Sequence, residues 1–477
     1  MKLITIREFE SLCAVADGEA EGSAIGLKRV GIRQRRFEQL KRCLASMADK
    51  DPVADQLMRF HRHGGVDLLT AQNYVGVIRF ADGAQIEILP KIEIDDGEGC
   101  RSVSSDSETV SVQKKELKKR TRKIFLKMLR ALLDYEDKAK SSGAARVDDS
   151  QMRVFDFFVR RFLDDVAKLV KRGLKGGYSS IAANERFFKG KLNVAENIRQ
   201  NDVHKERFFV EYDVFSSDAP ENRLIKATLE LLRGETANVG CQNDIHRLLQ
   251  VLDEVPCSRN VDADLSSANA VRNGELYKSI IDWCGVFLRG RGFATFTGAH
   301  DVQALLFPME KIFEAYVAHV VRKNADGWSV NVQGGGGFRR WLFDEPTGCF
   351  ALKPDIVLSK GAELILVDTK WKRLDKGERH YGISQGDMYQ MYAYGKHYAE
   401  DGRRVRGLHL VYPDRLEVDQ SVLPTFMSGV GHAANSCENA VRVGIDLFRF
   451  GVGDDRDFVK RLLNEKSCAQ SRCGGMV

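Results

Sequence analysis

The chain has 477 residues, of which 43% are hydrophobic and 29% charged, and its formal net charge is +6 at pH 7. This is the composition of a globular protein with a real core, divided into about two or three domains. No apolar run approaches the eighteen or so residues of a membrane span, and the first residues lack the apolar core of a signal peptide. The ten cysteines are scattered without a C-x-x-C pair, so we expect a cytoplasmic protein with reduced thiols and no membrane contact.

Residues 1–95 have the pattern of a β-rich module. A strand is predicted at Leu3–Phe9, a basic helix at Arg33–Arg42, and two alternating strands within residues 74–93. The dipeptide Asp82-Gly83 sits where a hairpin turn belongs between those strands. This module suits a partner-docking element, a nucleic-acid reader or a purely structural unit, and the sequence leaves all three open.

The next part of the chain is predicted to be a linker followed by helices. Residues 96–113 are acidic, rich in serine and poor in large apolar side chains, which is typical of a flexible linker. Residues 114–300 are expected to form a mainly helical middle domain. Its clearest helix spans residues 151–172, where apolar residues recur at helical spacing. From residue 173 to 232 we expect a loop, a short strand and a further helix.

A β-hairpin is predicted between Leu352 and Arg373. Two short apolar runs flank a turn at Ser359-Lys360-Gly361, with Asp355 at the start of the first strand and Asp368 near the end of the second. An antiparallel hairpin folded at this turn brings the two aspartates together. Lys370 lies two residues after Asp368 and therefore points to the same face of the strand.

Two carboxylates and an ammonium at one point are the groups that metal-dependent phosphodiester hydrolysis requires. Carboxylate oxygens bind hard cations such as Mg²⁺, and a lysine near the strained phosphate stabilises its charge. The pattern of Pro354-Asp355, twelve residues, then Asp368-x-Lys370 resembles the PD-(D/E)xK nuclease signature.

A helix predicted after the hairpin strengthens this resemblance. Residues 384–398 have helical spacing and place Gln390 and Tyr394 four residues apart on one face. A Gln-x-x-x-Tyr helix after Asp-x-Lys resembles the RecB-like branch of the superfamily. Helix, three strands, helix and strand over residues 307–413 match the expected core of a nuclease domain at 301–450, followed by a tail at 451–477.

Three upstream stretches carry a resemblance to one family within that superfamily. Their order, upstream of the PD-(D/E)xK hairpin, resembles that in the McrC-like subunits of the McrBC 5-methylcytosine-specific restriction system. The resemblance spans residues 65–450. The matching residues are Arg172-Gly173-Leu174 with Tyr178; Lys189-Gly190-Lys191-Leu192; and Tyr212-Asp213, Asp218 and Asn222-Arg223-Leu224-Ile225-Lys226.

The resemblance implies a mixed α+β fold: an N-terminal β-rich module, a helical middle region and a C-terminal PD-(D/E)xK restriction-endonuclease-like domain. It also implies an endonuclease that cuts methylated DNA with an McrB-like AAA+ GTPase hexamer, docking through its N-terminal region and stimulating GTP hydrolysis. No G-x-x-x-x-G-K-[ST] run occurs in the chain, so the phosphate-cradling loop for GTP belongs to the partner.

The resemblance assigns roles to ten side chains or backbone groups. The expected Mg²⁺ ligands are Asp355, Asp368, the carbonyl of Thr369, and Glu314 on the first core helix. Lys370 is expected to orient or deprotonate water and stabilise the phosphate, and Gln390 and Tyr394 to position the site. Expected DNA contacts are Trp371, Lys372 and Arg373.

Two other functions remain open from the sequence. A stand-alone RecB-like repair nuclease uses the same hairpin, although its Cas4-like version needs an iron–sulfur cysteine cluster that these scattered cysteines do not supply. A non-catalytic activator or assembly factor of a AAA+ ring is the alternative from a different class. Such a factor has no need to keep Asp355, Asp368 and Lys370 together.

Overall fold

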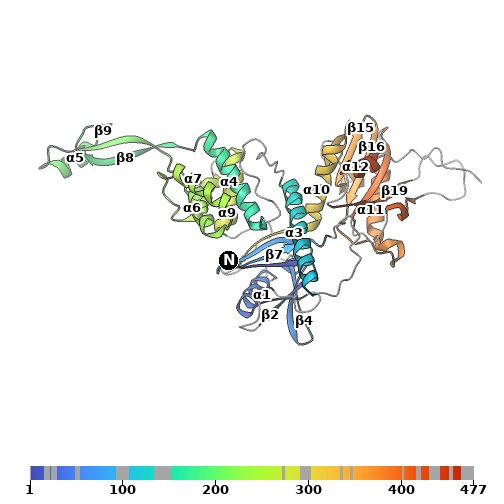
Figure 1. Cartoon of the computed structure of the whole chain (residues 1–477). Helices are drawn as coiled ribbons and strands as arrows, with labels where there is room; N and C mark the ends of the chain where they lie inside the picture. Colours follow the sequence, from blue (N-terminus) through green and yellow to red (C-terminus); the bar gives the residue numbers. More distant parts are fainter. Residues whose placement is uncertain are drawn as a thin grey trace, which may run out of the picture.

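The structure is a computed structural model with a mixed arrangement of helices and strands. An N-terminal β-rich part, a helical part with a long β-arm, and a C-terminal sheet between helices follow one another (Figure 1). The predicted α+β class is confirmed, and none of the described helices is long and apolar enough to cross a membrane. The structure describes residues 2–15, 22, 29–48, 54–92, 107–133, 152–270, 274–289, 302–333, 337–343, 348–399, 402–414, 420–428, 441–450 and 455–463.

The N-terminal part contains two four-stranded sheets. The predicted first strand, basic helix and hairpin are all present, and Gly83 in the hairpin turn has a φ of 78°. The first sheet runs in the order β1 (Leu3–Arg7), β7 (Gln85–Leu89), β6 (Tyr74–Phe80) and β11 (Val302–Pro308). The second sheet contains β3 (Arg29–Arg33), β2 (Ser11–Val15), β5 (Val66–Ala71) and β4 (Met58–His63), with helices α1 (Gln34–Ala48) and α2 (Ala54–Leu57) beside it.

Strand β11 joins the N-terminal sheet to the C-terminal part of the chain. It runs antiparallel to β6, although the whole predicted middle region, residues 114–300, lies between the two strands in the sequence. Gly76 permits this pairing, because a Cβ atom there would overlap the carbonyl oxygen of Leu305. Helix α10 (Met309–Asn324) follows β11 directly, and the Met309 N–H donates to the Asn73 carbonyl at 2.8 Å. The first strand of the predicted 301–450 domain therefore belongs to the N-terminal sheet.

Helix α3 (Ser107–Leu132) starts inside the predicted linker. Residues 107–113 are helical, so the linker prediction at 96–113 is wrong for this part. A basic run, residues 114–123, lies within this helix. Two of its side chains contact the N-terminal sheet: Lys118 donates to the Thr5 carbonyl at 3.0 Å, and Arg122 lies 2.7 Å from Glu87. Further along, Lys127 lies over the ring of Tyr316 on α10, which ties α3 to the C-terminal part.

The helical part is a bundle that includes the predicted long helix. Helix α4 (Val154–Arg172) buries its apolar stripe, as its spacing predicts. The other helices are α6 (Pro220–Glu235), α7 (Val239–Val251), α8 (Val261–Ala270) and α9 (Glu275–Arg289).

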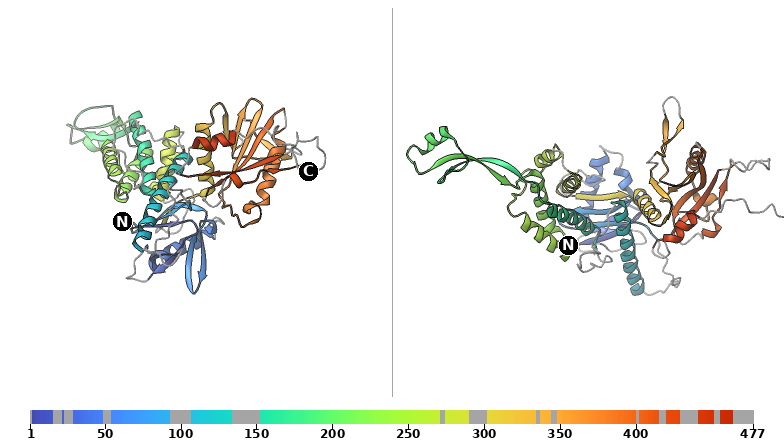
Figure 2. Two further views of the ribbon diagram at one scale, coloured as in Figure 1. Left: turned by 45° about the vertical axis from the view of Figure 1, so that its right-hand side comes forward. Right: turned by 90° about the horizontal axis from the view of Figure 1, so that it is seen from above.

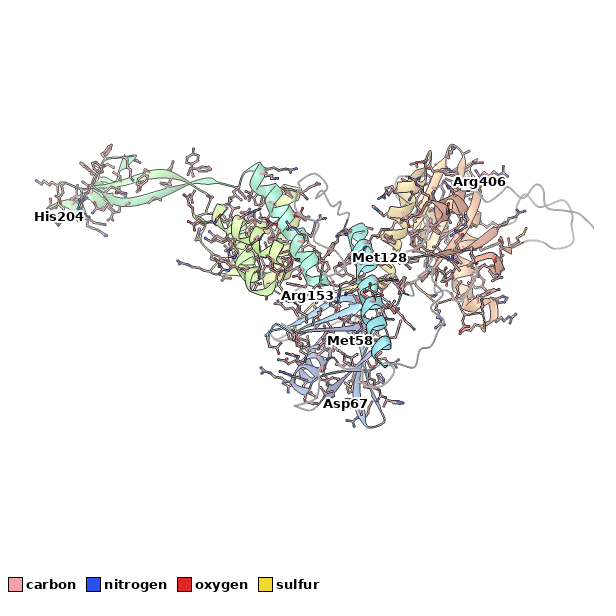
Figure 3. All side chains as sticks on the ribbon, viewed as in Figure 1. Met58, Asp67, Met128, Arg153, His204 and Arg406 are labelled. Atoms are coloured by element: carbon pink, nitrogen blue, oxygen red, sulfur yellow. The ribbon has the colours of Figure 1, made fainter. Side chains whose placement is uncertain are left out.

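A β-arm projects from the bundle, away from the rest of the molecule (Figures 1 and 2). Its two long strands, β8 (Gly177–Glu185) and β10 (Phe208–Ser216), pair antiparallel along their whole length. The short strand β9 (Lys191–Leu192) and helix α5 (Val194–Asn201) complete it, and His204 lies near its far end (Figure 3). The expected loop and short strand are thus one extended hairpin, followed by the predicted helix as α6.

The C-terminal part is built on a six-stranded mixed sheet. Helix α10 packs on one face with Ile356 and Val367, whereas α11 (Gln385–His397) covers the other face with Val357 and Leu366. The predicted order of helix, strands, helix and strand is present, with a separate hairpin of β13 (Arg340–Phe343) and β14 (Cys349–Leu352). The strand order is β12 (Ser329–Val332), β15 (Ile356–Lys360), β16 (Glu363–Thr369), β17 (Arg404–Pro413), β19 (Arg442–Phe448) and β18 (Phe426–Met427).

Part of the predicted tail at 451–477 belongs to the core. Helix α12 (Asp455–Leu463) packs against α10 and buries Phe458, Val459 and Leu462. The remainder of that tail lies outside the described residues.

Candidate active site

The predicted hairpin is confirmed as β15–β16. Its register pairs Ile356 with Val367 and Lys360 with Glu363, around a turn in which Gly361 has a φ of 59°. This register sets Asp355 opposite Asp368 at the open end of the hairpin. Asp368 is only 2% exposed and Asp355 is half-buried, so the hairpin end that carries them is not a fully solvated surface.

Asp355 is held in place by Thr369 on the neighbouring strand. The backbone N–H and the hydroxyl of Thr369 both donate to Oδ2 of Asp355, each at 2.7 Å. The carbonyl of Asp355 accepts from the N–H of Gln333 at 2.9 Å. Side chain and backbone of Asp355 are therefore both fixed before any substrate arrives.

Lys370 connects the hairpin to helix α11. Its Nζ lies 2.6 Å from Oδ2 of Asp368 and donates to Oε1 of Gln390 at 3.1 Å. Gln390 in turn donates from Nε2 to the hydroxyl of Tyr394 at 2.6 Å. The predicted convergence of hairpin and helix is confirmed, because Asp368, Lys370, Gln390 and Tyr394 form one chain of contacts.

Asp387 is a member of this cluster that the sequence analysis missed. It lies on the first turn of α11, with Oδ1 3.8 Å from Nζ of Lys370 and Oδ2 3.0 Å from Nζ of Lys372. Its N–H donates to the side chain of Ser384, which caps the helix. In the sequence Asp387 therefore looks like an ordinary residue of a helix N-terminus. The only indication of its position is that it lies three residues before Gln390 and so on the same helix face.

Glu314 approaches the site from helix α10. It is buried, with 7% of its surface exposed. Its Oε1 accepts from Gln333 at 3.0 Å and its Oε2 accepts from Lys311 at 2.9 Å. Gln333, which the sequence analysis also missed, therefore bridges Asp355 and Glu314 through its backbone and side chain.

The three carboxylates share one electrostatic environment. Burial, followed by the negative charges of Asp368 and Glu314, raises the pKa of Asp355 to about 7. Burial also raises the pKa of Asp368, although the Lys370 ammonium opposes the change. For Lys370 burial alone would lower the pKa, but the Asp368 carboxylate outweighs it and the pKa is raised. Burial and neighbouring negative charge therefore both oppose ionisation of Asp355.

Comparison with known proteins identifies the family. The model of the family described as "McrBC 5-methylcytosine restriction system component" matches residues 69–413. The chain belongs to this family. The sequence matches no curated protein.

Solved structures of McrBC assemblies resemble this McrBC family member. One chain of the refined half-complex from the tetradecameric assembly of Thermococcus gammatolerans McrB AAA+ hexamers with bound McrC aligns with a TM-score of 0.59 and 15% identity, over 97% of this chain and 99% of that chain. A chain of the cryo-EM structure of the Thermococcus gammatolerans McrBC complex aligns with a TM-score of 0.42 and 17% identity, over 68% and 88%. The first alignment shows a shared fold along nearly the whole chain.

The three residues after Lys370 have different environments in this McrBC family member. Trp371 is buried, with 6% exposed, and its indole N–H donates to Oε1 of Glu8 at 3.1 Å. An indole enclosed in this way does not reach a DNA backbone, so the predicted DNA contact is replaced by a structural role. Lys372 is exposed and pairs with Asp387, and Arg373 is exposed; both remain predicted DNA contacts.

The donor set suits Mg²⁺ without forming a closed metal cage. Among the described residues, no three side chains of His, Cys, Asp or Glu converge as a metal cluster. Mg²⁺ requires only one or two carboxylates because it keeps several waters. Asp355 and Asp368 provide these. Burial is the main cause of their raised pKa values, and at Asp355 the negative charge of Asp368 adds to it. Glu314 is already held by Lys311 and Gln333, so its part as a direct ligand stays a prediction.

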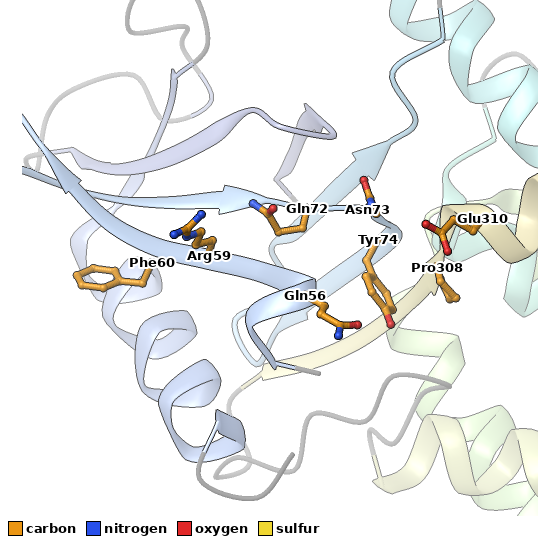
Figure 4. A pocket seen from close by; sticks show the side chains of 8 residues that line it. All are labelled: Gln56, Arg59, Phe60, Gln72, Asn73, Tyr74, Pro308 and Glu310. Carbon is orange, nitrogen blue, oxygen red and sulfur yellow. The ribbon is translucent and has the colours of Figure 1, made fainter. Parts of the chain in front are cut away.

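A cleft of about 650 Å³ lies between the N-terminal part and the start of α10 (Figure 4). Its wall includes Glu310, which lies one helical turn before Glu314 on α10. The paired aspartates of the hairpin do not line it, and three of its six polar side chains are neutral amides. The candidate active site is therefore the hairpin and not this cleft, which is lined by Gln56, Arg59, Phe60, Gln72, Asn73, Tyr74, Pro308 and Glu310.

Proposed function

We propose that this chain is the DNA-cleaving subunit of a modification-dependent restriction system, with the Mg²⁺-dependent chemistry of a PD-(D/E)xK nuclease. The observation that carries the proposal is the convergence of Asp355, Asp368 and Lys370 at the open end of one hairpin. Membership of the McrBC family supports the restriction system. The hairpin supports phosphodiester hydrolysis, because hard carboxylate oxygens and a cation meet there.

The residues that would hold Mg²⁺ are Asp355 and Asp368, with the carbonyl of Thr369 and with Glu314 at the edge. Bound Mg²⁺ would stabilise the negative charge that develops on the scissile phosphate. Thr369 already occupies Oδ2 of Asp355 with two hydrogen bonds, which orients the carboxylate and lowers the reorganisation needed for binding.

Lys370 acts in this proposal as a cation rather than as a base. The Asp368 carboxylate keeps the pKa of Lys370 above the ordinary lysine value, so the Lys370 ammonium stays protonated at neutral pH. A protonated lysine stabilises the pentavalent phosphate and orients water, but it does not remove a proton from that water. Gln390 accepts from Nζ of Lys370 and thereby sets the direction of the ammonium, while Tyr394 holds Gln390.

The partner in this proposal is a AAA+ GTPase hexamer that recognises methylated DNA in the cytoplasm. The aligned Thermococcus gammatolerans structure contains McrB AAA+ hexamers with bound McrC. The present chain contains no phosphate-cradling G-x-x-x-x-G-K-[ST] run. GTP hydrolysis would therefore take place on the partner, and this chain would stimulate it.

The β-arm is the better candidate for docking on that ring, and the N-terminal module at 1–95 is the alternative. Four aromatic side chains of the arm are strongly exposed: Tyr178 at 77%, Phe187 at 80%, Phe188 at 60% and Phe215 at 62%. Exposed aromatics gathered on a projecting element are typical of a protein interface. At the base of the arm, Asn222 donates to the carbonyls of Lys175 and Ser217, so the family-like residues there anchor the arm to the bundle.

The two alternative functions fit the molecule less well. A stand-alone RecB-like repair nuclease gives no reason for a projecting arm with exposed aromatics. A non-catalytic activator gives no reason to bury Asp368 beside Asp355, because burial of charged carboxylates costs free energy. Cleavage of a 5-methylcytosine-containing plasmid tests all three functions, with the full-length chain, Mg²⁺, GTP and the AAA+ partner. Cleavage only with the partner supports the proposal; cleavage without it supports the repair nuclease; GTPase stimulation without cleavage supports the activator.

A further inference from the structure

A buried hydrogen bond joins the beginning of the chain to the residue that follows Lys370. The indole Nε1 of Trp371 donates to Oε1 of Glu8 at 3.1 Å, across 363 residues of sequence. Glu8 is 1% exposed and Trp371 is 6% exposed. An acidic side chain is almost never buried so fully unless it is paired. The hydrogen bond from Trp371 is therefore one of the contacts that stabilise the buried Glu8 carboxylate.

Glu8 is fixed from the N-terminal side. It follows strand β1, its backbone N–H donates to the Leu89 carbonyl at 3.0 Å, and its Oε2 accepts from the Lys91 N–H at 2.8 Å. One carboxylate oxygen is therefore held by the N-terminal sheet. The other oxygen faces the indole of the C-terminal part.

Trp371 stands at the point where the catalytic strand leaves its sheet. Strand β16 ends at Thr369, and the Lys370 N–H makes one further bond, to the Val411 carbonyl at 2.9 Å. The next anchor along the chain is the Trp371 indole on Glu8. Its ring also packs against Phe313, at 5.2 Å between ring centroids, and Phe313 directly precedes Glu314 on α10.

We propose that Glu8 and Trp371 are positioning residues of the nuclease site, so that the N-terminal sheet is part of the scaffold that aims Lys370 and Glu314. This inference rests on the proposed nuclease function. Glu8 fixes Trp371, Trp371 fixes the backbone of Lys370 and the helix position of Glu314, and these side chains face Asp368 and Asp355. Loss of such a supporting contact typically costs 10- to 100-fold in activity.

The test is a double-mutant cycle on DNA cleavage by the full-length chain with its AAA+ partner, with Mg²⁺ and a methylated plasmid. Glu8→Ala removes the acceptor, and Trp371→Phe removes the donor and one of the two fused rings while keeping one aromatic ring. We expect each to lower the single-turnover cleavage rate about tenfold. Half-saturating DNA concentration and GTPase stimulation should stay within about twofold, and the double variant should be no worse than either single one.

Two further variants separate positioning from general stability. Glu8→Gln keeps one acceptor oxygen for only one of the two donors, the Trp371 indole or the Lys91 N–H, so it should lose less of the rate than Glu8→Ala without matching the wild type. Glu235→Ala breaks another contact of the N-terminal sheet, the Arg79–Glu235 ion pair with the helical bundle, and should leave the rate unchanged. Equal losses in Glu8→Ala and Glu235→Ala, or additive losses in the double variant, would overturn the inference.

Hydrogen exchange distinguishes failure of this inference from failure of the nuclease proposal. Glu8→Ala should speed exchange in peptides spanning residues 364–373, and Glu235→Ala should not. If the wild-type assembly does not cut DNA, the nuclease proposal fails, and the exchange result alone decides whether Glu8 holds this strand. Unchanged exchange in Glu8→Ala contradicts the positioning role whatever the cleavage result.

Discussion

Thr369 donates two hydrogen bonds to the same oxygen of Asp355, from its backbone N–H and from its hydroxyl, each at 2.7 Å. These bonds favour the charged carboxylate. Burial and the charges of Asp368 and Glu314 outweigh them and raise the pKa of Asp355 to about 7. The carboxylate is thus oriented as a ligand while its charge remains uncompensated, and a divalent cation would supply that compensation.

Mg²⁺ should stabilise the chain only where Asp355 is charged. The pKa of Asp355 rises from 3.8 to about 7 on folding, so the folded state binds the proton more tightly than the unfolded state. In EDTA the resulting stabilisation is fully present below about pH 4 and is lost as the pH rises through about 7. We therefore expect Mg²⁺ to raise the melting temperature clearly at about pH 8 and hardly at about pH 5.

Thermal unfolding followed by circular dichroism measures this effect, with Asp355→Asn as its control. The asparagine variant carries no charge at this position, so it should lose most of the Mg²⁺ response at the higher pH. It should also be more stable than the wild type in EDTA there, by an amount of order 1 kcal/mol. Equal Mg²⁺ stabilisation at both pH values would contradict the assignment of Asp355 as a ligand.

Asp355→Ala, Asp368→Ala and Lys370→Ala should each abolish DNA cleavage. Loss of a ligand or of the phosphate-stabilising cation is expected to cost at least about a hundredfold in rate. All three variants should keep GTPase stimulation of the partner, because the sites are on the C-terminal sheet and not on the arm. Lys360→Ala, at the turn of the same hairpin, is the matched control and should cut normally. If pure Lys370→Ala protein cuts at the wild-type rate, the hairpin is not the active site.

The hairpin and the helix that follows it could be predicted because the residues that come together in each of them are close in the sequence. Asp355 and Asp368 are brought together by a turn within a single short segment, and Gln390 and Tyr394 by one helical turn. Asp387 escaped prediction because a carboxylate in the first turn of a helix has an ordinary capping explanation. Its role depends on the distance to Lys370, which only the packing of α11 on the sheet determines.

Non-local contacts could not be predicted from the sequence. Nothing in the sequence of β11 indicates that it pairs with β6, and nothing in the residues around Glu8 indicates a contact with Trp371. The arm was also missed, because β8 reads GYSSIAANE and lacks the alternation of a half-buried strand. Strand β8 buries none of its described side chains, so the periodic signal on which strand prediction depends is absent.

Gln390→Ala should weaken cleavage less than the loss of Lys370. Gln390 orients the ammonium at 3.1 Å and is not an expected metal ligand, so a loss on the order of tenfold is expected. Tyr394→Phe removes only the hydroxyl that accepts from Gln390 and should lose less. Single-turnover cleavage at saturating Mg²⁺ ranks the variants. If Gln390→Ala is as inactive as Asp368→Ala with its fold intact, Gln390 contacts the metal or the phosphate directly.

Deletion of residues 1–110 should prevent cooperative folding of the remainder. It removes β6, the partner of β11, and the Asn73 carbonyl that accepts from Met309 at the start of α10. It also leaves the Trp371 indole without Glu8. Replacement of the arm, residues 178–214, by a short Gly/Ser linker is the contrasting deletion, since the arm forms its own sheet. Denaturant unfolding should remain cooperative only in the second protein; a cooperative first fragment would show that the C-terminal part is autonomous.

The exposed aromatics of the arm should be required for stimulation of the AAA+ partner. Phe187→Ser and Phe188→Ser, made together, alter side chains that are 80% and 60% exposed, so the fold should be unaffected while the interface loses its apolar anchors. We expect the half-maximal concentration for GTPase stimulation to rise at least tenfold, which corresponds to a loss of binding free energy of order 1.4 kcal/mol, with Mg²⁺ binding unchanged.

Phe350→Ser, 72% exposed on β14, controls for the loss of any exposed phenylalanine. Phe60→Ser, on β4, tests the N-terminal module. Normal stimulation by the arm variant together with loss in Phe60→Ser would move the docking surface to residues 1–95.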